Sequence, residues 1–385
     1  MTGTMHLTEI LERVDELIDV VFAHAEQAER EARLPRPVVD ALIERGLLRL
    51  WVPRSLGGPE LGLPESLAVF EAVSRLDGAT GWTVMIGSGG GLFAPRMVEG
   101  TARTIYGPRE GVIAGSGSPR GEAVEEGDGY RVTGQWPFAS GAHHATWFTA
   151  NCLVQRDGEL VSDLAGQPTI RAMAFPAAEV TILETWTASG MRGTGSHDFA
   201  VDGVVVPRER SFSVFEPLPD GTGPLYRYPF MATSRLAFSA VALGVGQQAL
   251  DRFAWFAAER RPGGGSAALS EYAQVRARYG EARATLRAGR SLLYETVAST
   301  WVLLEGGGAL DAGDEAEVTL AAVQATRLAV RAVDLLYELA GSDPLYLESA
   351  LGRSWRDVHA VAQHAALSPA AYEEAGGTLL DERTG

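Results

Sequence analysis

Apolar residues recur at intervals of three and four near the start of the chain, which is the spacing of one face of an α-helix. They occupy residues 7–18, and prolines interrupt the run at residues 34–37. The pattern therefore predicts helix over residues 6–50 with a break at these prolines. Further helices are predicted over residues 64–76 and from residue 79, where small residues dominate.

From about residue 111 the pattern changes to an alternation of apolar and polar residues, which is typical of half-buried β-strands. Residues 123–126 and 130–133 flank a Gly-Asp-Gly sequence and predict a hairpin with a tight turn. Residues 147–154 alternate in the same way, and Cys152 lies on their apolar face. We count six or seven short strands, enough for a small β-barrel or β-sandwich of about 100 residues.

After a proline-rich linker the helical spacing returns. Four long helices are predicted, over residues 232–260, 270–305, 314–340 and 353–367. Long helices joined by short breaks of glycine and proline predict an antiparallel up-and-down bundle. The expected fold class is mainly α with a central β-domain: an N-terminal helical domain over residues 1–110, a β-domain over residues 111–214 and a C-terminal four-helix bundle over residues 215–385.

The chain of 385 residues has a formal net charge of −16 and contains no lysine, so arginine supplies every fixed positive charge of a side chain. With no basic stripe to neutralise phosphates, the sequence argues against binding of nucleic acid or of anionic membranes. The single cysteine, Cys152, excludes an internal disulfide and is expected in the core. The acidic N-terminus lacks the features of a signal peptide, and no apolar stretch is long enough to span a bilayer. We therefore expect a cytoplasmic protein without a transmembrane helix.

The stretch richest in reactive and aromatic side chains is GQWPFASGAHHATW at residues 134–147. It brings Ser140, His143 and His144 to a predicted turn between strands. Such a cluster is equally consistent with the wall of a pocket for a flat ligand and with a capped hairpin over buried aromatic residues. Neither histidine has a partner at the spacing of metal ligands, so no metal site is predicted.

Three local motifs within this layout resemble the acyl-CoA dehydrogenase superfamily. They are GYRVTGQWPFASGAHHATW at residues 129–147, GMRGTGSHDFAVDGVVVP at residues 190–207 and RSWRDVHAVAQH at residues 353–364. The segment at residues 34–58 is also typical of the superfamily, so the resemblance covers nearly the whole chain. The motifs are most similar to the monooxygenase branch, the group D two-component flavin-dependent monooxygenases.

The C-terminal motif distinguishes the monooxygenases from the dehydrogenases of this superfamily. In many dehydrogenases a glutamate eight residues after an Arg-Asp pair abstracts the substrate α-proton, but eight residues after Asp357 this chain has Ala365. Alanine cannot accept a proton, so this base is missing. His364 stands one residue earlier and matches the histidine that, in the monooxygenases, assists formation or protonation of a flavin C4a-hydroperoxide. Imidazole titrates near neutral pH and can donate to a peroxide oxygen.

The resemblance also implies the other residues of the site. Ser140 aligns with a serine that contacts the flavin ring or the substrate, so Ser140 and His364 are the predicted catalytic residues. Aromatic side chains are expected to pack near the flavin ring, and a helix arginine, Arg276 or its neighbour Arg278, is expected to reach a flavin phosphate across a subunit boundary. The hydroxyls of the GTGS sequence are candidate flavin ligands, with a plain turn as an equal alternative. The predicted cofactor-binding residues are Trp136, Phe138, Ser140, Thr194, Ser196 and Arg276.

As a whole, the resemblance implies a reduced-flavin-dependent monooxygenase that hydroxylates an aromatic or polycyclic small molecule through a C4a-hydroperoxyflavin. It implies reduced flavin (FMNH2 or FADH2) and O2 as co-substrates, a separate NAD(P)H:flavin reductase and a homotetramer. Several phenol-hydroxylating relatives hold the phenolate with a histidine of the N-terminal domain, but residues 51–133 contain no histidine. Two alternatives stay open: an FAD-dependent dehydrogenase or oxidase with a relocated base, and a non-catalytic flavin-binding protein.

Overall fold

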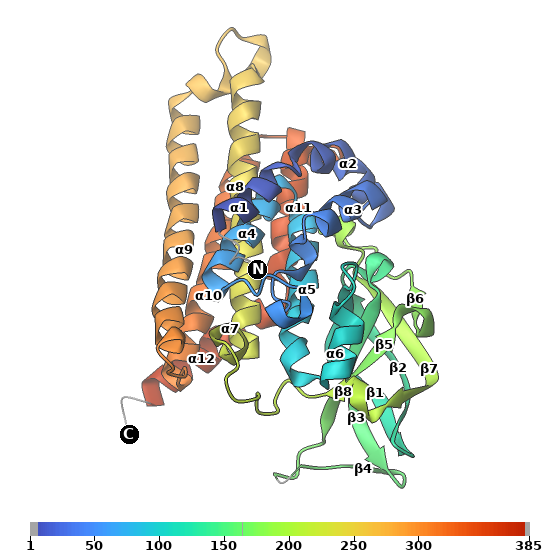
Figure 1. Ribbon diagram of the computed structural model, residues 1–385. Coiled ribbons are helices and arrows are strands. Elements are labelled where there is room, and N and C mark those ends of the chain that lie inside the picture. Colours follow the sequence, from blue (N-terminus) through green and yellow to red (C-terminus); the bar gives the residue numbers. More distant parts are fainter. Residues whose placement is uncertain (1–6, 164, 382–385) are drawn as a thin grey trace.

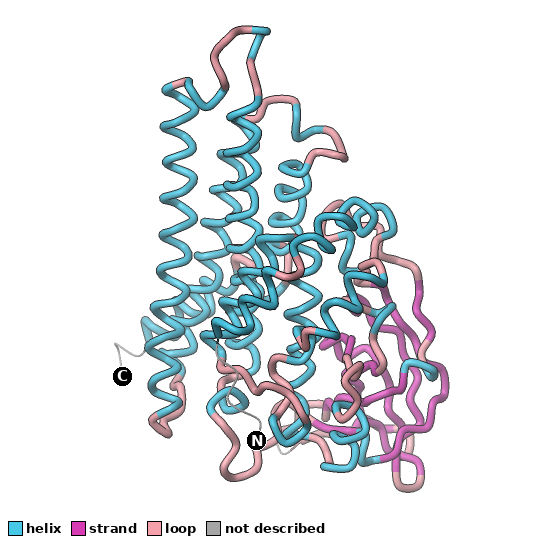
Figure 2. The backbone as a smooth tube through the Cα atoms, turned by 45° about the horizontal axis from the view of Figure 1, so that its top comes forward, coloured by secondary structure: helices cyan, strands magenta, loops and turns pink. Residues whose placement is uncertain are grey.

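The computed structural model describes residues 7–163 and 165–381, which form a helical part, a β-sheet part and a second helical part in chain order (Figure 1). Figure 2 shows the strands gathered on one side of the molecule, with helices and connecting loops making up the rest. The predicted fold class is confirmed, while the predicted outer domain limits, residues 1 and 385, lie outside the described residues. No helix in the described part of the chain combines the length and the apolar character needed to cross a membrane.

Helix α5 lies at the centre of the N-terminal part and is buried along nearly its whole length. Asp77 caps it, because its carboxylate accepts a hydrogen bond of 2.9 Å from the backbone N–H of Thr80. Small residues allow close packing in the 3₁₀ segment that follows α5: a Cβ atom at Gly91 would lie 2.4 Å from the carbonyl carbon of Trp51. The helices of this part are α1 (Leu7–Asp15), α2 (Ile18–Glu31), α3 (Arg36–Glu44), α4 (Leu63–Leu76), α5 (Gly78–Gly89) and α6 (Glu99–Tyr106).

The strands form one eight-stranded sheet in the order β6-β7-β2-β1-β3-β5-β8, with β4 beside β3. Strands β1 and β3 are parallel, whereas β2 pairs antiparallel with β1 and β7. The prediction of six or seven strands was too low, because β4 and β8 have only two residues each. Cys152 is fully buried in the sheet's core, as predicted. The strands are β1 (Ile113–Glu126), β2 (Gly129–Ala139), β3 (Trp147–Arg156), β4 (Glu159–Leu160), β5 (Ile170–Pro176), β6 (Thr181–Leu183), β7 (His197–Pro207) and β8 (Ser211–Phe212).

Helix α8 is the central helix of the C-terminal bundle, and it packs against α4, α10 and α11. The predicted fourth helix was too long: α11 ends at Ala362, and a separate 3₁₀ turn covers Ala365–Leu367. Helix α12 was not predicted, because Gly376 and Gly377 in its middle disfavour a helix. The helices of this part are α7 (Pro224–Arg227), α8 (Phe230–Glu259), α9 (Ala273–Glu305), α10 (Ala312–Leu339), α11 (Ala350–Ala362) and α12 (Ala370–Asp381).

Two buried polar contacts of α11 join the three parts of the chain. Asp357 accepts a hydrogen bond of 2.6 Å from the backbone N–H of Met191, in the loop before β7. Burial raises the pKa of Asp357 to about 7, and a nearby Asp77 adds to this effect. Its neighbour Arg356 donates to the carboxylate of Glu29 on α2 at 2.8 Å, and the side chains of this ion pair are only 13 % and 16 % exposed. The first contact holds the loop before β7 against α11, and the second holds α11 against α2.

Candidate functional site

Side chains from all three parts of the chain meet at one point. The indole of Trp82, on α5, stacks on Phe238 of α8 with ring centroids 5.1 Å apart. The imidazole of His364, just after α11, lies 4.2 Å from the Phe238 ring, measured between centroids. The indole Nε1–H of Trp82 donates a hydrogen bond of 3.0 Å to Ser140 Oγ, at the end of β2. We call Trp82, Ser140, Thr194, Ser196, Phe238 and His364 the three-domain cluster.

The position of Ser140 follows from the way β2 ends. The backbone has a left-handed conformation at Gly141 (φ +78°), and a Cβ atom there would lie 2.8 Å from His144 Nε2, which favours glycine. The turn brings Ser140 Oγ to within 2.7 Å of Ser196 Oγ, which lies 2.6 Å from Thr194 Oγ1. The predicted site residues Ser140, Ser196 and Thr194 therefore lie together, and all three are buried.

His364 reaches the cluster because it caps the 3₁₀ turn after α11. Its Nδ1 accepts a hydrogen bond of 3.2 Å from the backbone N–H of Ala366, so in the neutral ring Nε2 carries the proton. Burial lowers the pKa of His364 to about 4. Burial thus moves the pKa of this imidazole well below the near-neutral value of a free imidazole. At neutral pH the ring is a neutral hydrogen-bond donor, and its Nε2–H is the donating group.

Two of the predicted cofactor-binding residues lie elsewhere. Trp136 is fully buried in the core of the sheet, where it stacks on Phe199 and its indole N–H donates to Asn151 O at 2.9 Å. The structure thus gives Trp136 a packing role, because this position of β2 faces the sheet's core. Arg276 lies near the start of α9, and its Nε donates to Ser270 O at 2.8 Å. Within this chain Arg276 is not part of the three-domain cluster.

Phe138, also predicted to bind the cofactor, is an exposed aromatic residue two positions before Ser140. Its side chain is 67 % exposed, and its ring meets Trp186 edge to face with centroids 6.3 Å apart. Its backbone has φ +66°, an uncommon conformation for a residue with a side chain. Phe138 therefore presents its ring to solvent beside the cluster.

Sequence reasoning did not single out Trp82 or Phe238. Both are aromatic residues of buried helices, and such residues are usually part of the core. One signal was available: Trp82 is the one large polar-tipped side chain among the small residues of the sequence GATGWT. It also belongs to residues 51–133, the region in which no histidine was found.

The uncharged aromatic and hydrogen-bonding side chains of the three-domain cluster suit the ring of a flavin. A flavin ring has flat apolar faces and an edge of hydrogen-bonding atoms. The cluster offers aromatic side chains, the Nε2–H donor of His364 and the hydroxyl of Ser140. It carries no formal charge, because His364 is neutral. The residues present therefore fit the cofactor that the sequence predicts.

A second polar group lies near the cluster but does not suit a metal ion. His143 Nε2 and His197 Nε2 each lie 3.1 Å from a carboxylate oxygen of Glu184. His197 Nδ1 accepts a hydrogen bond of 3.1 Å from the backbone N–H of Trp186, so its Nε2 carries the proton in the neutral ring. A metal needs a nitrogen without a proton, so this bonding disfavours His197 Nε2 as a metal ligand.

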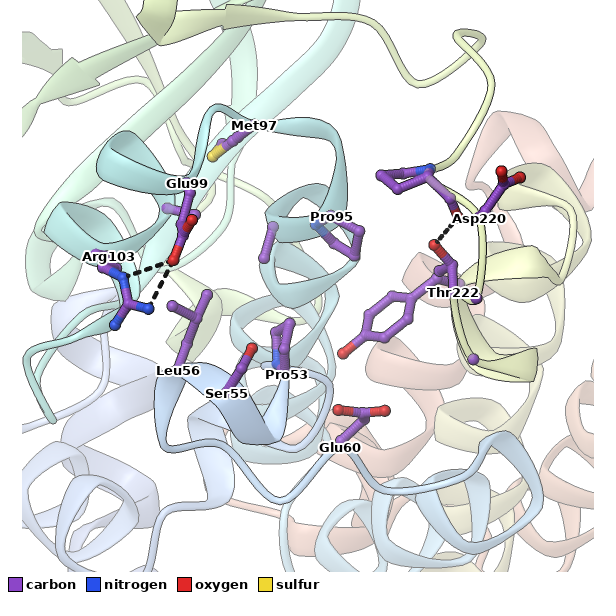
Figure 3. Close-up of a pocket in the computed structure, with 16 residues that line it drawn as sticks. Pro53, Ser55, Leu56, Glu60, Pro95, Met97, Glu99, Arg103, Asp220 and Thr222 are labelled. Carbon is purple, nitrogen blue, oxygen red and sulfur yellow. Dashed lines mark hydrogen bonds and ion pairs between the residues drawn. The ribbon is translucent and has the colours of Figure 1, made fainter.

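The pocket drawn in Figure 3 lies away from the three-domain cluster and shares no residue with it. It has a volume of about 400 Å³ and lies between the 3₁₀ turn at Arg54–Leu56, α6 and the segment before α7. On one wall Arg103 donates to Glu99 at 2.6 Å, so these opposite charges neutralise each other. A hydroxyl and an imidazole meet in a buried aromatic setting at the three-domain cluster, whereas no histidine lines this pocket.

The chain matches two models of one family. Residues 4–102 match the N-terminal domain of acyl-CoA dehydrogenase, and residues 236–369 match its C-terminal domain. The chain is 30 % identical to indole-3-acetate monooxygenase of Pseudomonas putida, over 95 % of this chain and 93 % of the relative. It is 29 % identical to the flavin-dependent monooxygenase oxygenase subunit HsaA of Mycobacterium tuberculosis, over 94 % of this chain and 92 % of the relative.

A solved structure shows the same fold over nearly the whole chain. XiaF from Streptomyces sp., in complex with FADH2 and glycerol, superposes with a TM-score of 0.88 at 26 % identity, and the match covers 97 % of this chain and 96 % of the other.

Proposed function

Because the chain belongs to the two-component flavin-dependent monooxygenases of the acyl-CoA dehydrogenase superfamily, we propose that it hydroxylates an aromatic or polycyclic small molecule at the three-domain cluster. One observation carries this proposal. A neutral imidazole donor, a buried serine hydroxyl and two aromatic rings, from three separate parts of the chain, converge on one point. This convergence is what a reaction on a bound flavin needs from the protein.

His364 and Ser140 have distinct parts in this proposal. When bound, the reduced flavin supplies the chemistry, because it reacts with O2 and provides the oxygen atom that reaches the substrate. His364 donates its Nε2–H to an oxygen atom in the site, and it keeps that proton at neutral pH. Ser140 hydrogen-bonds the flavin ring. Trp82 is only 9 % exposed and Ser140 only 6 %, so this point excludes water and limits side reactions.

The lining of the cluster favours an aromatic ring in the substrate. Trp82 and Phe238 stack on each other and make this point apolar, and no side chain of the cluster carries a fixed charge that could hold an ionic group. A ring rich in electrons suits this surface, as in the indole-3-acetate of the relative's name. The substrate therefore places its ring, rather than any charged group it carries, against these two residues.

The remaining features of the proposal concern the assembly. A separate NAD(P)H:flavin reductase supplies FMNH2 or FADH2, which agrees with the name "oxygenase subunit" of one relative. The chain acts in the cytoplasm as a homotetramer, in which Arg276 reaches the flavin phosphate of a neighbouring subunit. Exposed apolar side chains on α8 and α9 support subunit contacts in this region, notably Trp255 at 72 % and Val302 at 68 % exposure. The three domains have the limits 1–110, 111–214 and 215–385.

The proposal is tested by reconstituting the reaction from separate components. The purified chain should be colourless or lose its flavin on dialysis, and with NADH alone it should form no product. Adding an unrelated NADH:flavin reductase and free flavin should start hydroxylation of members of an aromatic panel. A chain that keeps stoichiometric yellow flavin, and that reduces this flavin with an acyl-thioester, would instead be a dehydrogenase.

A further inference from the structure

The hydroxyls of the three-domain cluster form a continuous row of hydrogen bonds, which ends on the backbone carbonyl of Met191. Ser140 Oγ lies 2.7 Å from Ser196 Oγ, and Ser196 Oγ lies 2.6 Å from Thr194 Oγ1. Thr194 Oγ1 in turn donates to Met191 O at 2.8 Å. The three side chains are between 1 % and 6 % exposed, so water competes little for these bonds. We call Ser140, Ser196 and Thr194 the hydroxyl row.

The direction of the hydroxyl row is fixed at the Met191 end. A carbonyl oxygen can only accept, so the single hydroxyl proton of Thr194 lies on the contact with Met191 O. Ser196 must then donate to Thr194 Oγ1, and Ser140 must donate to Ser196 Oγ. If the row ran the other way, two oxygen atoms 2.8 Å apart would face each other without a proton between them.

Neighbouring contacts hold this end of the row in place. The indole N–H of Trp186 also donates to Met191 O, at 3.1 Å. The backbone N–H of Met191 donates to the buried carboxylate of Asp357 at 2.6 Å. The carbonyl that sets the direction is therefore fixed from both sides of the peptide.

The consequence for Ser140 is that its own proton is already used inside the protein. One of its two lone pairs accepts from the indole N–H of Trp82 at 3.0 Å, and Trp82 can only donate. A single lone pair remains for a ligand. Toward a bound molecule Ser140 is therefore an acceptor and not a donor.

This polarity distinguishes the two redox states of a flavin. The ring nitrogen N5 carries a proton in reduced flavin and donates, whereas in oxidised flavin the same nitrogen has a lone pair and accepts. We propose that the free lone pair of Ser140 meets this ring nitrogen and that the hydroxyl row thereby makes the site selective for reduced flavin, with Thr194 and Ser196 as positioning residues that act through Ser140. This inference rests on the proposed function, and it deepens it by naming the residues that set the preference for the reduced cofactor.

The preference is measured as the ratio of two dissociation constants, for oxidised and for reduced flavin, by anaerobic titration of the full chain. In Thr194→Val the end of the row loses its hydroxyl, so the hydrogen bond between Ser196 and Ser140 can reverse its direction. Ser140 can then donate its proton to a ligand. The ratio should then fall by roughly three- to tenfold, the range of one neutral hydrogen bond. Ser196→Ala interrupts the row at its middle and should lower the ratio in the same direction.

Two further variants separate polarity from general damage to the site. Trp82→Phe removes a donor to Ser140 but leaves the direction of the row unchanged, so both dissociation constants should rise and their ratio should stay constant. Thr149→Val, a buried threonine of β3 outside the row, should change neither constant. Circular dichroism establishes that each variant is folded.

The outcomes distinguish this inference from the function on which it rests. A wild-type chain that prefers reduced flavin, together with a lowered ratio in both row variants, supports it. An unchanged ratio in Thr194→Val and Ser196→Ala overturns this inference alone. A wild-type chain that binds neither redox form overturns the proposed function and this inference with it.

Discussion

His364 performs two separable tasks, one with each ring nitrogen. Nδ1 accepts the backbone N–H of Ala366 at 3.2 Å and so caps the 3₁₀ turn after α11. Nε2–H is the donor offered to the site. Two amide side chains can each retain one of these tasks: His364→Asn keeps an acceptor at the position of Nδ1, and His364→Gln reaches the position of Nε2 with a donor.

The expected effects of the two variants are opposite. Loss of the cap in His364→Gln should lower the free energy of unfolding by about 1 kcal/mol, a typical value for a helix N-cap. In His364→Gln the amount of product formed per flavin oxidised should stay close to the wild-type value. His364→Asn should keep the turn, and it should lower product yield roughly tenfold to a hundredfold, because one hydrogen-bond donor to a reacting oxygen is lost.

The assay combines a urea titration with a measurement of product and H2O2 under the same reductase supply. Because burial lowers the pKa of His364 to about 4, the contribution of its Nε2–H to product yield should be constant from about pH 5.5 to 8. Wild-type product yield in His364→Asn would refute the donor role. A larger loss in His364→Gln than in His364→Asn would show that the turn, rather than the donor, is what the reaction needs.

Three further predictions concern stability, and each is measured as the free energy of unfolding in urea. Burial lowers the pKa of His144 from 6.5 to about 4, so between these pH values the unfolded chain binds a proton that the folded chain does not. The free energy of unfolding should therefore fall by up to about 3 kcal/mol as the pH drops through this window, and His144→Met should reduce this dependence on pH. Arg356→Met leaves Glu29 without its buried partner and should lower the free energy of unfolding by about 3 kcal/mol. Adding Glu29→Gln should restore part of this stability, and equal losses of stability in the single and double variants would contradict the prediction. Gly91→Ala places a methyl group against a backbone carbonyl and should cost about 1–3 kcal/mol, whereas Gly89→Ala, with open space around its Cβ, should be neutral or stabilising.

The periodicity of the sequence was enough to predict the three-part architecture, because amphipathic helices and alternating strands leave direct patterns. The periodicity did not predict those features of the helices and strands that depend on tertiary contacts. α11 ends at Ala362 and His364 then caps a separate 3₁₀ turn, which the helical spacing did not distinguish from a longer helix. α12 contains two glycines, which helix propensity disfavours. The shortest strands were missed because two or three residues are too few to show an alternation.

The residues of the candidate site could be predicted where they belong to local sequence motifs. They could not be predicted where they reach the site only through packing. The motifs placed Ser140, Thr194 and Ser196 among the candidates, and the structure brings these three hydroxyls together. Trp136 and Trp82 cannot be told apart by sequence, since both are tryptophans in apolar surroundings. Only the fold shows that Trp136 faces the sheet's core while the indole N–H of Trp82 reaches Ser140.

The central claim, that this chain transfers an oxygen atom from O2 with reduced flavin, is tested most directly by a single turnover with isotopically labelled oxygen. The purified chain is mixed with chemically reduced FMN or FAD, a panel of aromatic substrates and ¹⁸O2 in the absence of any reductase. The products are analysed by mass spectrometry. The account predicts a product that contains one ¹⁸O atom and forms only when the chain is present. Recovery of all the consumed oxygen as H2O2 across the whole panel, by a folded chain that binds the reduced flavin, would contradict it.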